Sequence, residues 1–406
     1  MPAILLSDAT LIDGTGADPR PHVSVLVEEG RIGRIAAAGA IATPDGARVI
    51  DAAGRTLMPG LTDAHVHFGL TATSDQDPIE SHVSYVLKVV ENIRLALEEG
   101  FTTVRDAGGL DPAYALAVAS GQISGPHILP SGSFLSITGG HGDHRSPWSD
   151  VGTPSIAGLV AHTELVDGVD AVRLAARTQL RRGATQVKLF ASGGVMSPTD
   201  PLDSLQFTVE EIAAAVHEAT AFGKYAMAHC HTSAAMNNAL DAGVRSIEHG
   251  SILDEQTARK MADHDAYLVP TLVIIELLSR MPELPEASRI KTEMVHGKTA
   301  ASIMIAQAAG VHIGSGSDLL GPRQRRRAGE LVEKAKHFGA MGAIVSATKT
   351  NAELFRLQDR IGTVAEGKNA DLILVDGDPL ADITTLADAR NIPLVMKAGA
   401  VVKDAL

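Results

Sequence analysis

Short apolar runs alternate with longer amphipathic stretches through the middle of the chain. The short runs predict strands, and the stretches between them have the apolar spacing of helices. The predicted strands are 61–67, 102–107, 127–132, 186–192, 225–231, 246–250, 267–272 and 312–318. The predicted helices are 78–99, 112–121, 169–183, 208–222, 233–243, 254–263, 286–309 and 328–338. Regular alternation of strand and helix is typical of βα units, and eight units predict a (β/α)8 barrel.

Local signals support the ends of these helices. Thr208 followed by Val-Glu-Glu has the pattern of a capping box at a helix start. Glycines follow several of the helical stretches directly, where a left-handed residue commonly ends a helix. These are Gly100, Gly183, Gly223, Gly243 and Gly310.

Both ends of the chain have a different pattern. Residues 1–57 alternate with a period of two, as at Val23, Val25 and Val27, and Glu28-Glu29-Gly30 indicates a hairpin turn. The stretch after 361 also predicts strand, turn and strand. We therefore expect an α/β protein in which a barrel at 58–356 carries a small β-sandwich formed by 1–57 and 357–406.

One long interruption, at 136–168, is rich in Gly, His, Asp, Ser and Pro. A loop of this length inside a compact domain is usually functional. We expect it to lie over the mouth of the barrel.

Polar residues recur at the ends of the predicted strands. His65 and His67 lie two positions apart, so both side chains face the same side of their strand. His229, His249 and Asp318 end three later strands. Each signal has an ordinary alternative, such as a surface pair, a core histidine or a helix cap. Together they predict one site of imidazole and carboxylate ligands, which suits Zn²⁺ or a similar cation.

Lys188 stands in the apolar run QVKLF. A buried ammonium is costly unless it is paired. Either this side chain faces outward with a partner, or it is chemically altered. Addition of CO₂ to the amine would make it an anionic carbamate that bridges two cations.

Composition and charge exclude some classes of binding partner and cellular location. The 406 residues carry a net charge of -13, which disfavours nucleic acids and anionic membrane surfaces. The start of the chain lacks the features of a signal peptide, and no stretch approaches the about 20 apolar residues of a membrane helix. The single cysteine, Cys230, fits a reducing compartment and alternates away from the predicted site. We expect a cytoplasmic protein.

The sequence resembles the metal-dependent amidohydrolase superfamily over its whole length. The segments PGLTDAHVH, GFTTVRDAGG, SITGGHGDH, SIEHG and GTVAEGKNADLILVDGDPL carry the resemblance, which is strongest to the imidazolonepropionase-like subgroup. That subgroup includes binuclear zinc dipeptidases of the Xaa-Pro and Xaa-Arg types and ochratoxin-hydrolysing enzymes. Members are often homo-oligomers.

The resemblance implies a ligand set and a mechanism. His65, His67 and Asp318 would hold one divalent metal ion, favoured to be Zn²⁺, and His229 and His249 a second. Carbamylated Lys188 would bridge them. A hydroxide between the two metals would attack an amide carbonyl, and Asp318 would move the proton to the leaving amine.

The resemblance also assigns substrate contacts. His141, in GGHGD, matches the residue that polarises the scissile carbonyl, and His231 matches a substrate contact. The expected substrate is a small molecule with an amide to a C-terminal amino acid, either a dipeptide or an N-acyl amino acid such as ochratoxin A. Its carboxylate could bind an arginine of the basic stretch 321–327, such as Arg323, although this stretch could equally be a solvated helix start or a subunit contact. His144, Arg145 and Trp148 could line the pocket or simply be exposed.

Two other functions stay open. A mononuclear cyclic amidohydrolase or deaminase of the imidazolonepropionase type usually lacks the bridging lysine, so Lys188 argues against it. A non-catalytic scaffold should have lost ligands, and this sequence has the complete set.

Overall fold

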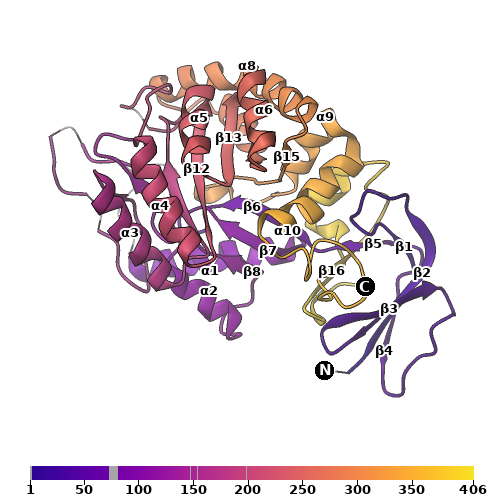
Figure 1. The fold of residues 1–406 in the computed structure, drawn as a ribbon. Coiled ribbons are helices and arrows are strands. Elements are labelled where there is room, and N and C mark those ends of the chain that lie inside the picture. Colours follow the sequence, from indigo (N-terminus) through magenta and orange to yellow (C-terminus); the bar gives the residue numbers. More distant parts are fainter. Residues whose placement is uncertain (1, 73–80, 147, 153, 198) are drawn as a thin grey trace.

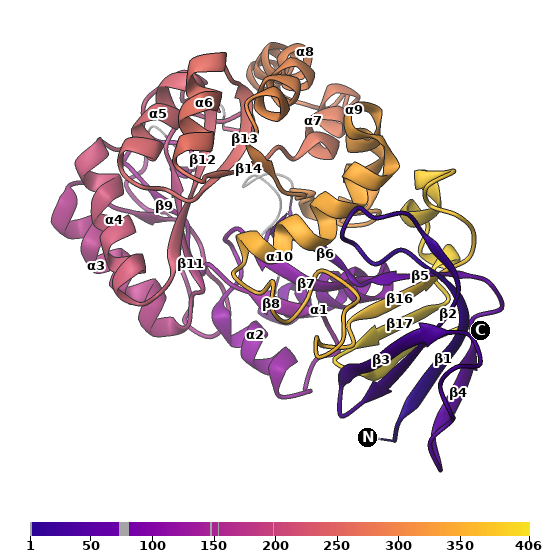
Figure 2. The same cartoon turned by 45° about the vertical axis from the view of Figure 1, so that its right-hand side comes forward.

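The structure, a computed structural model, describes residues 2–72, 81–146, 148–152, 154–197 and 199–406. Helices enclose the parallel strands from the middle of the chain, and strands from the two chain ends lie together at one side (Figures 1 and 2). The protein is thus a mixed α/β structure with parallel sheets and one separate mixed sheet.

The largest parallel sheet has seven strands in the order β10-β9-β11-β12-β13-β14-β15. They are β9 (Leu135–Ser136), β10 (Glu164–Leu165), β11 (Gln186–Phe190), β12 (Tyr225–Thr232), β13 (Ser246–Ile252), β14 (Tyr267–Val269) and β15 (His312–Ile313). All neighbouring pairs in it are parallel. Their carboxyl ends therefore lie at the same edge of the sheet, where the predicted site residues stand.

A second parallel sheet contains β6 (Leu61–Val66), β7 (Phe101–Asp106) and β8 (His127–Leu129). Backbone hydrogen bonds connect β6 to the segment after β15. The Ala64 amide donates to the Ser315 carbonyl at 2.8 Å, and the Asp318 amide donates to the His65 carbonyl at 2.7 Å. These bonds bring the first and last predicted strand ends together.

Helices alternate with these strands. They are α1 (His82–Glu98), α2 (Pro112–Ala119), α3 (Val169–Arg182), α4 (Val209–Ala221), α5 (Ser233–Asp241), α6 (Glu255–Asp263), α7 (Leu272–Ser279), α8 (Glu286–Ala308), α9 (Gly329–Val345) and α10 (Asn351–Leu354). Short 3-10 helices cover Gly321–Arg323, Ile383–Ala387 and Ala389–Asn391, and a π-helical turn covers Ser346–Thr350. The predicted capping box is confirmed, because Thr208 and Glu211 bond each other's backbone amides at the start of α4. All five predicted terminal glycines have positive φ, from 68° to 106°.

The prediction of a strand over 267–272 is wrong at its end. β14 stops at Val269, and α7, which the sequence did not predict, starts at Leu272. Thr271 has a φ of 49°, a left-handed conformation that turns the chain sharply between the two elements. An unbroken apolar run does not reveal such a turn, because buried strand and buried helix have the same composition.

The two chain ends form one mixed sheet of eight strands (Figure 2). Its strands are β1 (Ile4–Leu11), β2 (Arg20–Glu28), β3 (Arg31–Ala37), β4 (Arg48–Asp51), β5 (Thr56–Pro59), β16 (Leu372–Val375), β17 (Leu394–Lys397) and β18 (Ala400–Asp404). β5 and β16 pair antiparallel and connect the ends. The predicted pairing of the termini is confirmed, as is the hairpin turn, where Glu29 and Gly30 have φ values of 49° and 79°.

The long interruption at 136–168 stays mostly irregular. Its far end returns to the sheet, where Glu164 and Leu165 pair with Leu135 and Ser136. The predicted start of the first helix at 78 lies outside the described residues.

Small aliphatic residues fill the space between strands and helices. Cys230 is buried in the cluster that joins β11, β12 and β13 to α3, α4 and α5, so its predicted place in the core is confirmed. None of the helices in the described ranges combines the length and the apolar content that crossing a bilayer requires.

Candidate metal centre and active site

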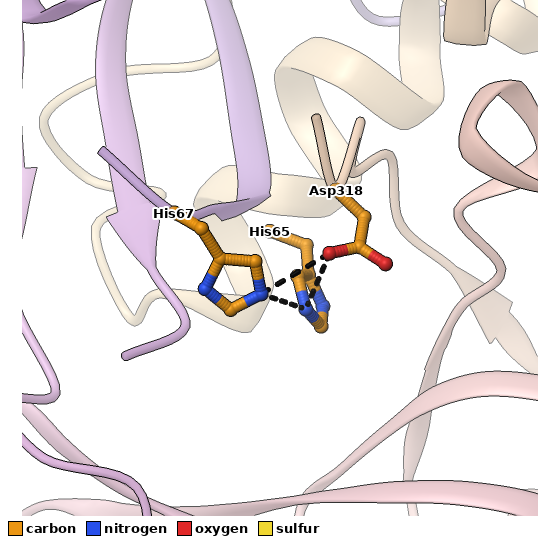
Figure 3. A group of neighbouring side chains, drawn as sticks. All are labelled: His65, His67 and Asp318. Carbon is orange, nitrogen blue, oxygen red and sulfur yellow. Dashed lines mark hydrogen bonds and ion pairs between the residues drawn. The ribbon is translucent and has the colours of Figure 1, made fainter. Parts of the chain in front are cut away.

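His65, His67 and Asp318 converge at the junction of β6 with the segment after β15 (Figure 3). The two Nε2 atoms are 3.2 Å apart, and Asp318 Oδ1 lies 3.1 Å from Nε2 of His67 and 3.5 Å from Nε2 of His65. Ligands of a tetrahedral Zn²⁺, at about 2.0–2.1 Å from the ion, are separated by about 3.3 Å. The three atoms therefore have the spacing of neighbouring ligands on one cation.

The outer nitrogen of each histidine is held by a hydrogen bond. His67 Nδ1 donates to the Gly108 carbonyl at 2.8 Å, and His65 Nδ1 donates to Glu248 Oε2 at 2.6 Å. A proton on Nδ1 leaves the lone pair on Nε2, where the two rings meet Asp318. Burial lowers the pKa of His65 to about 4, which keeps this ring neutral. In His67 burial lowers the pKa, but Asp318 outweighs burial and raises it, so a proton competes with a cation at Nε2 of that ring.

Glu248 in β13 has a fully buried carboxylate that receives four hydrogen bonds. Arg105 Nη2 donates to both oxygens at 2.9 and 3.1 Å, and the Ser246 hydroxyl donates to Oε1 at 2.5 Å. The fourth donor is His65. Burial alone would raise the pKa of Glu248, but Arg105 and His65 lower it to about 2. An ionised Glu248 therefore fixes the ring of His65.

We expect Glu248→Gln to weaken metal binding by about 10- to 100-fold, because an amide NH₂ would face the Nδ1–H of His65 or the guanidinium of Arg105. Competition with a chromogenic chelator measures this affinity on folded protein. Glu218→Gln is the matched control, since Glu218 forms a two-bond pair with Arg177 between α3 and α4. Equal metal affinity in the two variants would contradict the role of Glu248.

Asp63 connects the two chain segments that carry the group. Its Oδ1 accepts from the amides of His65 and Ser317 at 3.1 and 2.9 Å, and its Oδ2 accepts from the Ser317 hydroxyl at 2.5 Å. Asp318 follows with a φ of 53°, a conformation that is uncommon outside glycine. This strained backbone turns the Asp318 carboxylate toward the two histidines.

His229 and His249 lie beside this group, with ring centroids 4.5 Å apart. His229 Nε2 faces the Gly193 carbonyl at 3.2 Å, and His249 Nδ1 faces the Thr271 hydroxyl at 2.7 Å. One nitrogen of each ring is thus engaged, and the other is available to a ligand. His249 is 5.1 Å from His65 between ring centroids. The structure therefore places the predicted second pair next to the first group.

Lys188 is buried on β11, with its Nζ 5.5 Å from the centroid of the Phe190 ring. Burial lowers the pKa of its amine to about 8, although Glu248 and Asp318 partly counter this. Within the described part of the chain, Nζ forms no hydrogen bond or ion pair. A paired, outward-facing lysine is thus wrong, and the amine lies inside the site.

His141 and His231 complete the wall of the site. The ring of His141 stacks on His229 with centroids 4.6 Å apart, and the ring of His231 stands edge-on to His229, also at 4.6 Å. His231 Nδ1 bonds the Ser251 hydroxyl at 3.0 Å. Burial lowers the pKa of His231 to about 3 and that of His141 well below its usual value. Both rings are therefore neutral near pH 7.

Residues 56–402 match the Amidohydrolase family. This chain belongs to that family. The match covers most of the 406 residues and includes every side chain of the site. The protein is therefore a metal-dependent hydrolase, and the buried group of His65, His67 and Asp318 is its candidate metal site.

Several characterised proteins resemble this amidohydrolase along most of its length. The ochratoxinase of Aspergillus niger is 33% identical over 374 residues, which cover 86% of this chain and 75% of the ochratoxinase. A prolidase solved with N-methylphosphonate-L-proline is 38% identical, with a TM-score of 0.93. The alignment covers 99% of this chain and 100% of the prolidase chain. A Xaa-Pro dipeptidase solved with methionine in its active site is 32% identical, with a TM-score of 0.90 and the same coverage.

The structure places the other predicted substrate contacts on loops of the amidohydrolase, outside the group of metal-ligand candidates. Arg323 ends a 3-10 helix, and its side chain lies outside the described part of the structure. His144 is exposed near His141, Arg145 pairs with Asp143 at 2.7 Å, and Trp148 is 94% exposed. The guanidinium of Arg145 is therefore engaged within its own loop.

Several site residues of the amidohydrolase were missed from the sequence. Glu248 immediately precedes His249, and strict alternation along β13 would place their side chains on opposite faces. A φ of 71° at His249 interrupts that alternation, so both side chains approach His65. The motif SIEHG was a usable signal, because a carboxylate in a buried strand needs a partner. No comparable sequence motif indicates that Arg105 contacts Glu248 or that Thr271 contacts His249.

Proposed function

We propose that this amidohydrolase cleaves the amide bond to a C-terminal amino acid in a small molecule, either a dipeptide or an N-acyl amino acid such as ochratoxin A. The buried group of His65, His67 and Asp318 carries the proposal. Proteins similar to this chain include a prolidase, a Xaa-Pro dipeptidase and an ochratoxinase, and these names support a substrate of this class.

The proposed site would hold two divalent cations, for which imidazole and carboxylate ligands favour Zn²⁺. His65, His67 and Asp318 would hold one, and His229 and His249 the other. Carbamylated Lys188 would bridge them, because its buried amine lies beside Phe190, whose ring contacts His229. Bound metal ions would supply Lewis-acid activation of the carbonyl and of a water at neutral pH.

The protein side chains divide the remaining work. Asp318 would act as the base. Burial raises the pKa of its carboxylate, but His65 and His67 outweigh burial and lower it, so the group is ionised and can accept a proton. It takes a proton from the attacking water and delivers it to the leaving amine. Neutral His231 can donate an N–H to the carbonyl oxygen as its negative charge grows, and His141 would contact the scissile amide beside it.

We further infer that the two parallel sheets are parts of one (β/α)8 barrel at 58–356, and that 1–57 and 357–406 form a β-sandwich domain. The backbone bonds between β6 and the segment after β15 support closure of the barrel. A substrate in its mouth would meet the loop that contains His144 and the basic stretch that contains Arg323. Either could bind the substrate carboxylate.

A screen of Xaa-Pro, Xaa-Phe and Xaa-Arg dipeptides and ochratoxin A tests the function. We expect at least one substrate to release its C-terminal amino acid. A chelator should abolish this activity, and Zn²⁺ should restore it. The same substrate with its carboxylate converted to an amide is the matched control, and it should be cleaved much more slowly.

Two results would contradict the proposal. In the first, the enzyme contains two metal ions per chain but releases no amino acid from any of the carboxylate-bearing amides in the screen. The other is a single metal ion per chain with hydrolysis or deamination of cyclic amides, which would favour the mononuclear type of enzyme.

A further inference from the structure

His141 is joined to a buried polar array on the loop after β11. Its Nδ1 lies 2.9 Å from the Ser197 hydroxyl, and this hydroxyl also bonds Asp200 Oδ1. Ser197 and Asp200 are 2% and 3% exposed. The other carboxylate oxygen, Oδ2, accepts from the Gly194 amide at 3.0 Å and from Gln206 Nε2 at 3.2 Å. One nitrogen of His141 is therefore engaged away from the metal centre.

Packing fixes the imidazole of His141 on its remaining sides. A Cβ atom at Gly194 would lie 2.1–2.4 Å from three atoms of the ring, so only glycine allows this approach. The ring of Phe190 stands edge-on at 4.9 Å, and His229 stacks at 4.6 Å between centroids. Gln206 Oε1 also accepts from the backbone amide of His141 at 2.8 Å. The ring thus has one defined orientation.

Lys291 of α8 holds the loop itself. Its ammonium donates to the carbonyls of Gly194, Ser197 and Asp200 at 3.0, 2.7 and 2.5 Å. An ammonium has three protons, so these bonds use its full donor capacity. Lys291 is therefore not a contact for the substrate carboxylate, and its charge serves to gather three backbone carbonyls.

We propose that Ser197, Asp200 and Lys291 are positioning residues for His141. Ser197 binds Nδ1, Asp200 orients the Ser197 hydroxyl, and Lys291 fixes the loop that carries both. Because the Ser197 proton goes to Asp200, Nδ1 of His141 carries the ring proton toward Ser197, and Nε2, with its lone pair, is the nitrogen left to face the substrate amide. The proposal rests on the proposed function of His141, and it adds the residues that hold this loop histidine in one orientation beside the substrate.

Ser197→Ala and Ser204→Ala form a matched pair of variants. Both serines lie on the same loop, but Ser204 meets the array only by accepting a 3.2 Å bond from Gln206, which keeps its own bonds to His141 and Asp200 when Ser204 is changed. We expect Ser197→Ala to lower kcat by about 10- to 100-fold, because a misplaced catalytic group costs up to about 10²-fold. KM and metal content should change little. Ser204→Ala should retain kcat.

A double-mutant cycle separates positioning from a general effect on the fold. In a His141→Ala background, Ser197→Ala should cause less than about a twofold further loss, because residues that act through one another are not additive. Lys291→Met changes no atom of Ser197 or His141 themselves but releases the loop that carries Ser197, and it should follow the same pattern. Equal losses in both backgrounds would overturn the proposal.

Nitrogen NMR of ¹⁵N-histidine protein provides a readout that is independent of turnover. His141→Ala identifies the His141 signals. The Nδ1 signal should move in Ser197→Ala and stay in Ser204→Ala, and an unchanged signal in Ser197→Ala would overturn the proposal. If the wild-type enzyme cleaves no amide, the proposed function fails, but this signal still decides whether Ser197 holds His141.

Discussion

Asp318→Asn is expected to lower turnover by about 10³-fold or more while leaving the fold intact. An amide has the size of a carboxylate and keeps one oxygen toward His67, but it cannot accept and release a proton near pH 7. Loss of a positioned general base typically costs about 10²–10⁴-fold. Loss of the negative charge beside two histidines weakens metal binding as well. Steady-state kinetics and metal analysis of the same preparation measure both effects.

Asp265→Asn is the matched control for this variant. Asp265 also has a positive φ, of 51°, and its carboxylate also faces a histidine, with Oδ1 3.1 Å from Nε2 of His312. It precedes the amino-terminal end of β14, whereas the metal centre lies at the carboxyl-terminal ends of the strands, and its side chain is 69% exposed. Asp265→Asn should retain wild-type turnover. Asp318→Asn with more than about a tenth of wild-type activity, at full metal content, would exclude Asp318 as the base.

The sequence correctly predicts the place of a side chain where strand periodicity, or position at a strand end, determines the direction in which it points. His65 and His67 share a face because side chains alternate along a strand, and they meet Asp318 because parallel strands end at one edge. The same reasoning placed Cys230 in the core between His229 and His231. Lys188 was harder, since its residue type allowed a paired outward position, and only the structure shows the amine to be buried.

The sequence was insufficient where the backbone leaves its regular path. Left-handed residues at Thr271 and His249 end one strand early and bring Glu248 and His249 to the same histidine. Threonine is β-branched and strongly disfavours positive φ, and histidine adopts it only in a minority of cases, so neither residue type predicts these turns. The partners of the site residues are also distant in sequence, such as Arg105 with Glu248 and Lys291 with Gly194. Periodicity carries no information about pairs of this kind.

Lys188→Ala is expected to abolish turnover and to reduce the metal content from two ions per chain to about one. Removal of the side chain removes the proposed bridge between the cations, and it leaves a space between β11 and the histidines. A small carboxylate such as acetate or propionate could enter that space and replace the carbamate. We therefore expect partial recovery of activity with millimolar propionate, and none with propionamide, which has the same shape but no charge.

Lys334 is the matched control for Lys188. Both lysines are fully buried, and burial lowers the pKa of each amine to about 8. The difference is in their partners, because Lys334 Nζ bonds the Gly314 carbonyl and the Ser346 hydroxyl and lies 3.9 Å from Glu330. An amine whose lone pair or protons are engaged in this way is not free to add CO₂. Burial and a lowered pKa alone are thus insufficient, and the orphaned position of Lys188 is what we expect to select it.

Growth or reconstitution with ¹³C-bicarbonate tests this selectivity directly. The wild-type protein should show one ¹³C carbamate signal. That signal should persist in Lys334→Met and disappear in Lys188→Ala. A signal that survives in Lys188→Ala, or two metal ions retained by that variant without any added carboxylate, would show that the cations are held together by some other group. The bridge between the two histidine sets would then have to be sought elsewhere on the strand ends.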